Sequence, residues 1–110
     1  MTIQHKQLAE NRWSELSFFA QMANIGSETE RAIKWRKKEN AEYAEKAFER
    51  ALELFDLTAA DKKNQKRLKE ILRAREMFAD YFAGGNNYHS TGKQWQKYFF
   101  AFNFAARLNA

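Results

Sequence analysis

Apolar residues in the middle of the chain recur at steps of three and four positions. On a helix with about 100° between residues they gather along one broad stripe. Asn40 precedes the stripe and can cap a helix start, while Glu42 and Glu45 place negative charge in the first turn. The pattern predicts an amphipathic helix over 40–58, contacted by neighbours on two sides. The stripe consists of Ala44, Ala47, Phe48, Ala51, Leu52, Leu54 and Phe55.

A second periodic segment precedes this helix and predicts a helix over about 17–38. Ser17 is a helix-start signal, and the phase of the apolar positions is kept across Gly26. Glycine costs a helix about 1 kcal/mol relative to alanine, so we expect Gly26 to mark a tight crossing by another helix. A break at Gly26 into two short helices is the alternative. The apolar positions are Phe18, Met22, Ile25, Thr29 and Ala32.

Two further helices follow, over about 63–83 and 91–108. The third has a possible cap at Asp61, and we expect Gly84 and Gly85 to end it in the left-handed conformation. Thr91 and Gln94 have the spacing of a capping box, which predicts the start of the fourth helix.

The composition of the 110 residues favours helix throughout. Proline is absent and glycine occurs four times, so the turn residues that a many-stranded fold needs are missing. We predict one all-α domain over 1–110, a four-helix up-down-up-down bundle, with residues 1–10 as a flexible arm.

The sequence lacks the residues and motifs that several kinds of functional site, and secretion or membrane insertion, would require. Without cysteine there is no disulfide or thiolate site, and two histidines far apart make a zinc site improbable. No catalytic, metal or cofactor motif is recognisable. His89 beside Ser90 does not form a nucleophile and base pair, because neighbouring side chains diverge. No apolar run has the length of a signal peptide or membrane span, so we expect a cytoplasmic protein.

The fourth helix carries apolar residues on too many sides. Trp95 and Phe99 share one face, whereas Phe100 and Phe104 point nearly opposite. Either neighbours within the domain, such as the N-terminal arm, cover these two rings, or they form a subunit interface. We favour the second and predict a homo-oligomer with Phe100 and Phe104 at the contact.

Arg75 interrupts the apolar stripe of the third helix. A charge in that position is predicted to be buried, and it must pair with a carboxylate, since an unpaired buried charge is very costly. The structural interpretation, an ion pair that sets helix register, is favoured over an anion-binding or catalytic arginine. The candidate partners are Glu28, Glu30 and Asp56.

The formal net charge is +5, and the cations fall in two runs that an up-down bundle places at opposite ends. Cations at the end of the first helix complement its dipole, whereas those at the start of the third oppose it, so the second run is the better candidate for a polyanion site. Trp35, Tyr88, His89 and Lys93 are expected to approach the first run. The first run is Lys34, Arg36, Lys37 and Lys38; the second is Lys62, Lys63, Lys66, Arg67 and Lys69.

Four strings of the sequence resemble a small prokaryotic all-helical family with no established activity. They are NIGSE (24–28), ERAIKW (30–35), RALELFDLT (50–58) and YFFAF (98–102). The resemblance implies one compact helical domain and supplies no mechanism. The general plan also resembles HEPN-type helical bundles, but neither His5 nor His89 has the arginine that HEPN ribonucleases carry four to six residues earlier.

These observations favour a non-enzymatic interaction or scaffold protein that self-associates. The alternative is a basic accessory protein that binds RNA or DNA through 62–69. A HEPN-like nucleotide-binding protein or ribonuclease comes third.

Overall fold

The computed structural model describes residues 11–108, and within that range it contains helices and no strand. Residues 11–14 form a helical turn ahead of α2. The prediction of an all-α protein is confirmed, while the predicted arm, 1–10, lies outside the described residues. The elements are α2 (Phe18–Lys37), α3 (Ala41–Ala60), the 3₁₀ helix η1 (Lys62–Arg67), α4 (Leu68–Ala83) and α5 (Gly92–Leu108).

Side-chain caps start the helices where the sequence predicts them. The Asn40 side chain accepts a hydrogen bond from the Tyr43 N–H, at 3.1 Å. Thr91 and Gln94 form a reciprocal capping box, with distances of 2.9 and 3.2 Å. Helix α2 runs without a break through Gly26, so the alternative of two short helices is wrong.

Two helix boundaries differ from prediction by more than one residue: the end of α3, at Ala60 instead of 58, and the start of α4. The segment 62–67 is a 3₁₀ helix, so α4 begins at Leu68 instead of 63. Asp61 caps this 3₁₀ helix, because its side chain accepts from the Lys63 N–H at 3.1 Å. These six residues thereby turn the chain from α3 into α4.

The left-handed residues after α4 are Asn86 (φ 52°) and His89 (φ 54°), and no glycine has positive φ among the described residues. The predicted left-handed stop at Gly84 and Gly85 is therefore wrong. Asparagine tolerates this conformation when its side chain bonds locally. Here the Asn86 side chain bonds the backbone N–H and C=O of Ser90, at 2.9 and 3.1 Å, which stabilises the loop.

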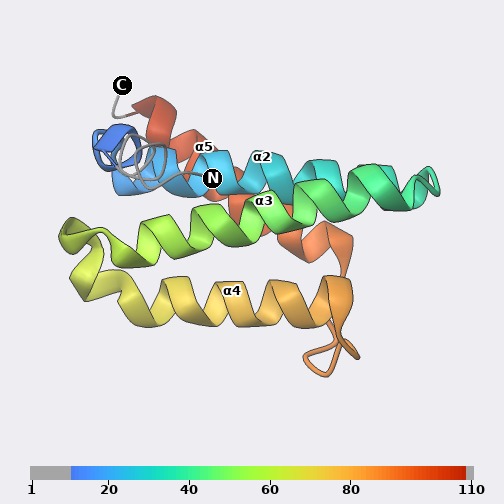
Figure 1. Ribbon diagram of the computed structural model, residues 1–110. Helices are drawn as coiled ribbons and strands as arrows, with labels where there is room; N and C mark the ends of the chain where they lie inside the picture. Colours follow the sequence, from blue (N-terminus) through green and yellow to red (C-terminus); the bar gives the residue numbers. More distant parts are fainter. Residues whose placement is uncertain (1–10, 109–110) are drawn as a thin grey trace.

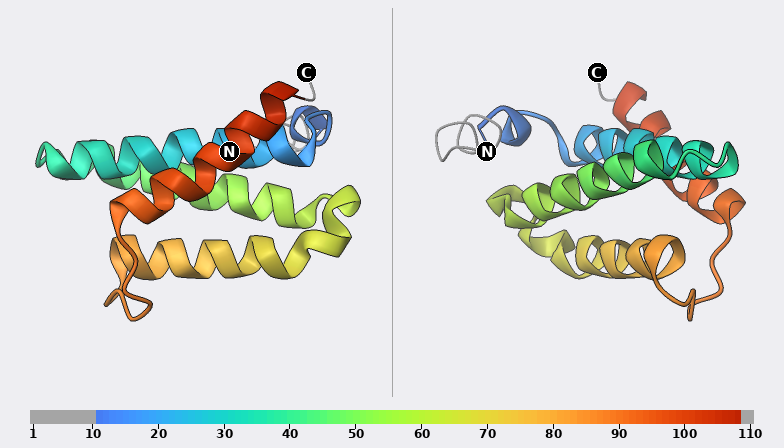
Figure 2. Two further views of the ribbon diagram at one scale, coloured as in Figure 1. Left: turned by 180° about the vertical axis from the view of Figure 1, so that it is seen from behind. Right: turned by 45° about the vertical axis from the view of Figure 1, so that its right-hand side comes forward.

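Helices α2, α3 and α4 follow one another in alternating directions, and α5 lies behind them (Figure 1). Seen from behind, α5 crosses α2 obliquely (Figure 2). The direction of the chain alternates as predicted, but a bundle of four aligned helices is not confirmed.

The core lies between α2, α3, α4 and the inner face of α5. Trp95 and Phe99 of α5 are 6% and 5% exposed. A Cβ added to Gly26 would lie 2.7 Å from the Phe99 Cβ, so the expected tight crossing at this glycine is confirmed. The largest fully buried apolar side chains are Met22, Ile25, Phe55, Ile71 and Phe78.

No helix among residues 11–108 is both long enough and apolar enough to cross a bilayer. The cytoplasmic location stays a prediction.

Candidate interaction surface

The outward side of α5 carries three large exposed apolar side chains on consecutive turns. Phe100, Phe104 and Leu108 are 67%, 55% and 70% exposed. Because they are spaced by four residues, they line up as one ridge, which we call the α5 ridge. The rings predicted to face outward do so, and Leu108, which the sequence analysis missed, extends them.

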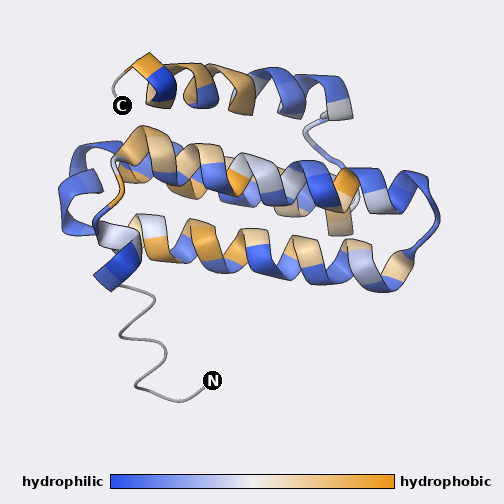
Figure 3. Cartoon of the chain, turned by 90° about the horizontal axis from the view of Figure 1, so that it is seen from above, coloured by the Kyte–Doolittle hydropathy of each residue, from blue (hydrophilic) through white to orange (hydrophobic). Residues whose placement is uncertain are grey.

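Cations flank the α5 ridge on the same side of the helix. With about 100° between successive residues, one arc of about 100° around α5 contains the three ridge residues together with Lys93, Lys97 and Arg107. All three are exposed, and α5 contains no Asp or Glu. Viewed from above, hydrophilic residues occupy the first turns of α5 and hydrophobic ones its C-terminal half (Figure 3). We call the ridge and these three cations together the α5 face.

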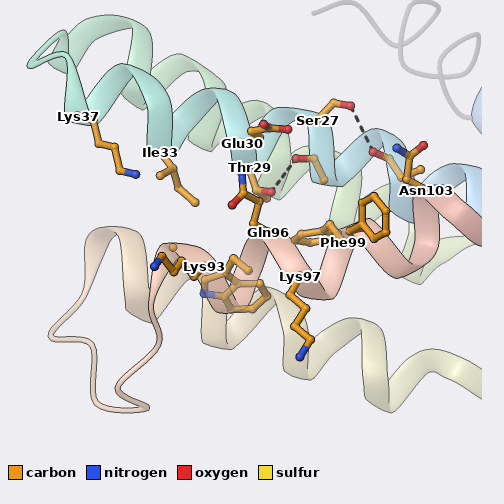
Figure 4. Close-up of a pocket in the computed structure, with 15 residues that line it drawn as sticks. Ser27, Thr29, Glu30, Ile33, Lys37, Lys93, Gln96, Lys97, Phe99 and Asn103 are labelled. Carbon is orange, nitrogen blue, oxygen red and sulfur yellow. Dashed lines mark hydrogen bonds between the residues drawn. The ribbon is translucent and has the colours of Figure 1, made fainter.

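A groove of about 600 Å³ runs between α2 and α5 beside this face. Lys37 lines it from α2, and Lys93 and Lys97 line it from α5, with the Lys97 side chain extending away from α2 (Figure 4). Glu30 is its only acidic lining residue, so the groove carries net positive charge. Its base is formed where Phe99 packs on Gly26.

The groove brings part of the first basic run to α5, as predicted for Lys93. Trp35 also approaches this run, since Lys38 Nζ lies 5.3 Å from the centre of its ring, whereas Tyr88 and His89 lie elsewhere. Trp35 packs against Tyr43 with ring centroids 5.0 Å apart. Tyr88 lines a different hollow, between α4 and α5, and His89 is exposed in the loop.

The second basic run lies at the opposite end of the molecule from the end of α2, as predicted (Figure 1). Two of its five members already have intramolecular partners. Lys63 Nζ lies 2.6 Å from Asp61 and 2.8 Å from the Ser14 carbonyl oxygen, and the Arg67 guanidinium lies 4.5 Å from the centre of the Phe18 ring. Lys62, Lys66 and Lys69 are exposed. Polyanion binding at this run stays a prediction.

Arg75 pairs with Asp56, one of the three predicted partners. Its Nε donates to the Asp56 carboxylate at 2.8 Å. The Arg75 side chain is 34% exposed and that of Asp56 62%, so the charge is only partly buried, less than predicted. Arg75 lies at the edge of the contact between α3 and α4, where its long side chain reaches water. The pair joins α3 to α4 as a structural link.

A hollow of about 610 Å³ separates α4 from α5. Ala74 and Met77 line it from α4, and Trp95 and Tyr98 from α5. Burial raises the pKa of Tyr98 to about 12, with a contribution from the negative charge of Glu70. The indole Nε1 of Trp95 is buried and has no hydrogen-bond acceptor among the described residues. This hollow is a site of incomplete packing between α4 and α5.

No group of three His, Cys, Asp or Glu side chains close enough to hold a metal ion occurs in the part of the chain that the structure describes. The absence of a catalytic or cofactor site stays a prediction. Comparison with known proteins finds no matching family model, curated protein or solved structure.

Proposed function

We propose that this protein is a non-enzymatic interaction protein that self-associates through the α5 ridge. The observation that carries the proposal is the exposure of Phe100, Phe104 and Leu108 on three consecutive turns. Contiguous exposed apolar side chains of this kind mark interaction sites. In this proposal the protein acts in the cytoplasm, and its four-helix bundle is the scaffold that keeps the ridge on the outer surface.

The ridge alone supports only weak association. Full burial of a Phe or Leu side chain contributes about 1.5–3 kcal/mol, so three contribute at most about 5–9 kcal/mol. Association costs about 4–15 kcal/mol in lost translational and rotational freedom. A stable assembly therefore needs further contacts around the ridge.

The proposal is tested by light scattering over a range of concentrations. We expect the average mass to rise above the 13.0 kDa monomer as concentration increases. The double variant Phe100→Ser with Phe104→Ser should stay at the monomer mass, because it removes both exposed rings.

Tyr88→Ser is the matched control, since Tyr88 is 45% exposed and lies in the loop between α4 and α5, away from the ridge. It should self-associate like the wild type, and circular dichroism should show unchanged helix content in all variants. A wild-type protein that remains monomeric up to millimolar concentration contradicts the proposal.

A further inference from the structure

We propose that the assembly is head-to-tail, with the α5 face of one copy docked on the α3–α4 side of the next copy. This inference rests on the proposed self-association and names the surface that the α5 ridge meets. Three observations carry it: the charge of α5, an acidic stripe on α3, and exposed leucines on α4.

The charge of α5 disfavours pairing of two α5 helices. An antiparallel pair of α5 helices brings two copies of these cations into one interface, and when it is centred between Phe100 and Phe104, at residue 102, it places Lys97 opposite Arg107 of the partner subunit. Since α5 contains no Asp or Glu, nothing on this helix compensates that repulsion. Like charges brought together at an interface cost free energy and suppress the pairing.

The exposed side of α3 carries the opposite charge. Lys46 and Arg50 lie among its carboxylates but are bonded to Glu42 and Glu53, both at 3.2 Å. With Arg75, which pairs with Asp56, the stripe has a net charge of −2, counting its five acids and these three cations. Its acids are Glu42, Glu45, Glu49, Glu53 and Asp56, all exposed and spaced by three or four residues.

Apolar surface adjoins the acidic stripe. The bond from Arg75 to Asp56 shows that this side of α4 borders the stripe. Leu72 precedes Arg75 by one turn and Leu68 by two, and they are 47% and 36% exposed. We call the acidic stripe and these two leucines the α3–α4 face.

Charged and apolar residues follow the same order along the two faces. Because α3 and α4 are antiparallel, Leu68 and Leu72 lie toward the Asp56 end of the stripe, away from Glu45. On α5, likewise, Lys93 and Lys97 occupy one end and the ridge the other. One docking orientation therefore brings lysines to carboxylates and aromatic rings to leucines together.

The two faces also lie on different sides of the molecule. Helix α3 is in front of α5 in Figure 1, and α5 is in front when the molecule is turned by 180° (Figure 2). A contact between different faces of identical copies is heterologous, so it continues into a ring or a filament.

A single-stranded nucleic acid would also suit the cations and rings of the α5 face, but it leaves the complementary α3–α4 face without a role.

The test mixes two variants, each blocked at one face. The first is Phe100→Ser with Phe104→Ser, and the second is Leu68→Ser with Leu72→Ser. Each variant alone should be monomeric, because each has lost one half of the contact. An equimolar mixture should form a dimer of twice the 13.0 kDa monomer mass, since one intact α5 face meets one intact α3–α4 face.

Charge is tested separately with Lys93→Glu plus Lys97→Glu, and with Glu45→Lys plus Glu49→Lys. Each pair should weaken association at least tenfold, and mixing the two proteins should restore it. These positions are exposed, so the fold is expected to persist, and circular dichroism checks it.

The outcomes separate this inference from the proposed function. If the leucine variant self-associates alone, the ridge pairs with itself, so the head-to-tail contact is wrong and self-association stands. If the wild type is always monomeric, both proposals fail. If that monomer binds a labelled single-stranded oligoribonucleotide and the phenylalanine variant does not, the α5 face is a nucleic-acid site.

Discussion

Gln21 is fully buried although its side chain is polar. Its amide donates to the Trp13 carbonyl oxygen and to the Asp61 carboxylate, both at 2.9 Å, and accepts from Asn64 at 2.8 Å. The Trp13 indole in turn donates to the Thr58 hydroxyl at 2.9 Å. Single side chains thereby join the segment before α2 to the end of α3 and to η1. These hydrogen bonds offset the free-energy cost of burying the polar Gln21 side chain.

Asp61 makes this network sensitive to acid. Burial on its own raises the pKa of Asp61, but hydrogen bonds from Lys63 and Gln21 outweigh burial and lower the pKa below its ordinary value of 3.8. A lowered folded-state pKa stabilises the protein above the unfolded-state pKa, and this stabilisation is lost as pH falls through the folded-state value. We expect Asp61→Asn to lower the free energy of unfolding by about 1–2 kcal/mol at pH 7, and less at pH 3.

Urea unfolding at pH 7 and pH 3 measures this difference. Asp56→Asn serves as the control, because Asp56 also holds a cation but is 62% exposed. Its effect at pH 7 should be under about 1 kcal/mol, as for exposed ion pairs. An Asp61→Asn protein with the same loss at both pH values contradicts the role of the Asp61 charge.

At the scale of elements, the contact between α2 and α5 sets which side of α5 faces outward. The capping box at Thr91 starts α5, and Phe99 packs directly on the backbone of α2 at Gly26. With Phe99 facing α2, Phe100 and Phe104 point away from the core. The candidate surface thus depends on a glycine in another helix.

Gly26→Ala tests this crossing. By helix propensity alone, alanine should stabilise α2 by about 1 kcal/mol. The added Cβ, however, would lie 2.7 Å from the Phe99 Cβ and 2.9 Å from its Cγ, so α5 must shift. We expect a net loss of about 1–3 kcal/mol in the free energy of unfolding, as for other overpacked sites.

Ser27→Ala on the same helix is the control, because Ser27 is exposed and the change relieves no crossing. It should leave stability unchanged or slightly higher in thermal or urea unfolding. A Gly26→Ala protein more stable than the wild type would show that α5 does not need the close approach.

For the whole molecule, charge is separated between faces although the formal net charge is only +5. The α5 face carries three cations and no carboxylate of its own helix, whereas the α3 stripe is net acidic. A head-to-tail contact uses this separation, because it places opposite charges together. A contact between two α5 faces opposes it.

Salt distinguishes the two arrangements. Attraction between exposed charges is screened over about 10 Å at 0.1 M salt and about 3 Å at 1 M. We expect self-association measured by light scattering to weaken several-fold between 0.05 and 0.5 M NaCl. Association that strengthens over this range would indicate pairing of like-charged α5 faces, because salt relieves their repulsion.

The sequence by itself determined the helices and most of their starts. Asn40 and Thr91 are recognisable because a cap bonds a backbone group three residues away, and apolar periodicity acts over the same short range. The end of α4 at Ala83 was predicted correctly, but the left-handed conformation of Gly84 and Gly85 and the start of this helix at 63 were predicted wrongly, since Asn86 takes that conformation and a 3₁₀ helix precedes Leu68. The sequence also showed that Phe100 and Phe104 cannot share a face with Phe99.

Only the tertiary structure decided the oblique path of α5, the groove between α2 and α5, and the partial exposure of Arg75. Each depends on residues far apart in the chain: Gly26 with Phe99, α2 with α5, and Asp56 with Arg75. Periodicity says which residues of one helix share a side, but the angle between two helices follows from how their surfaces fit. That fit left the α5 ridge with its cations, and the acidic side of α3, exposed on different sides of the molecule.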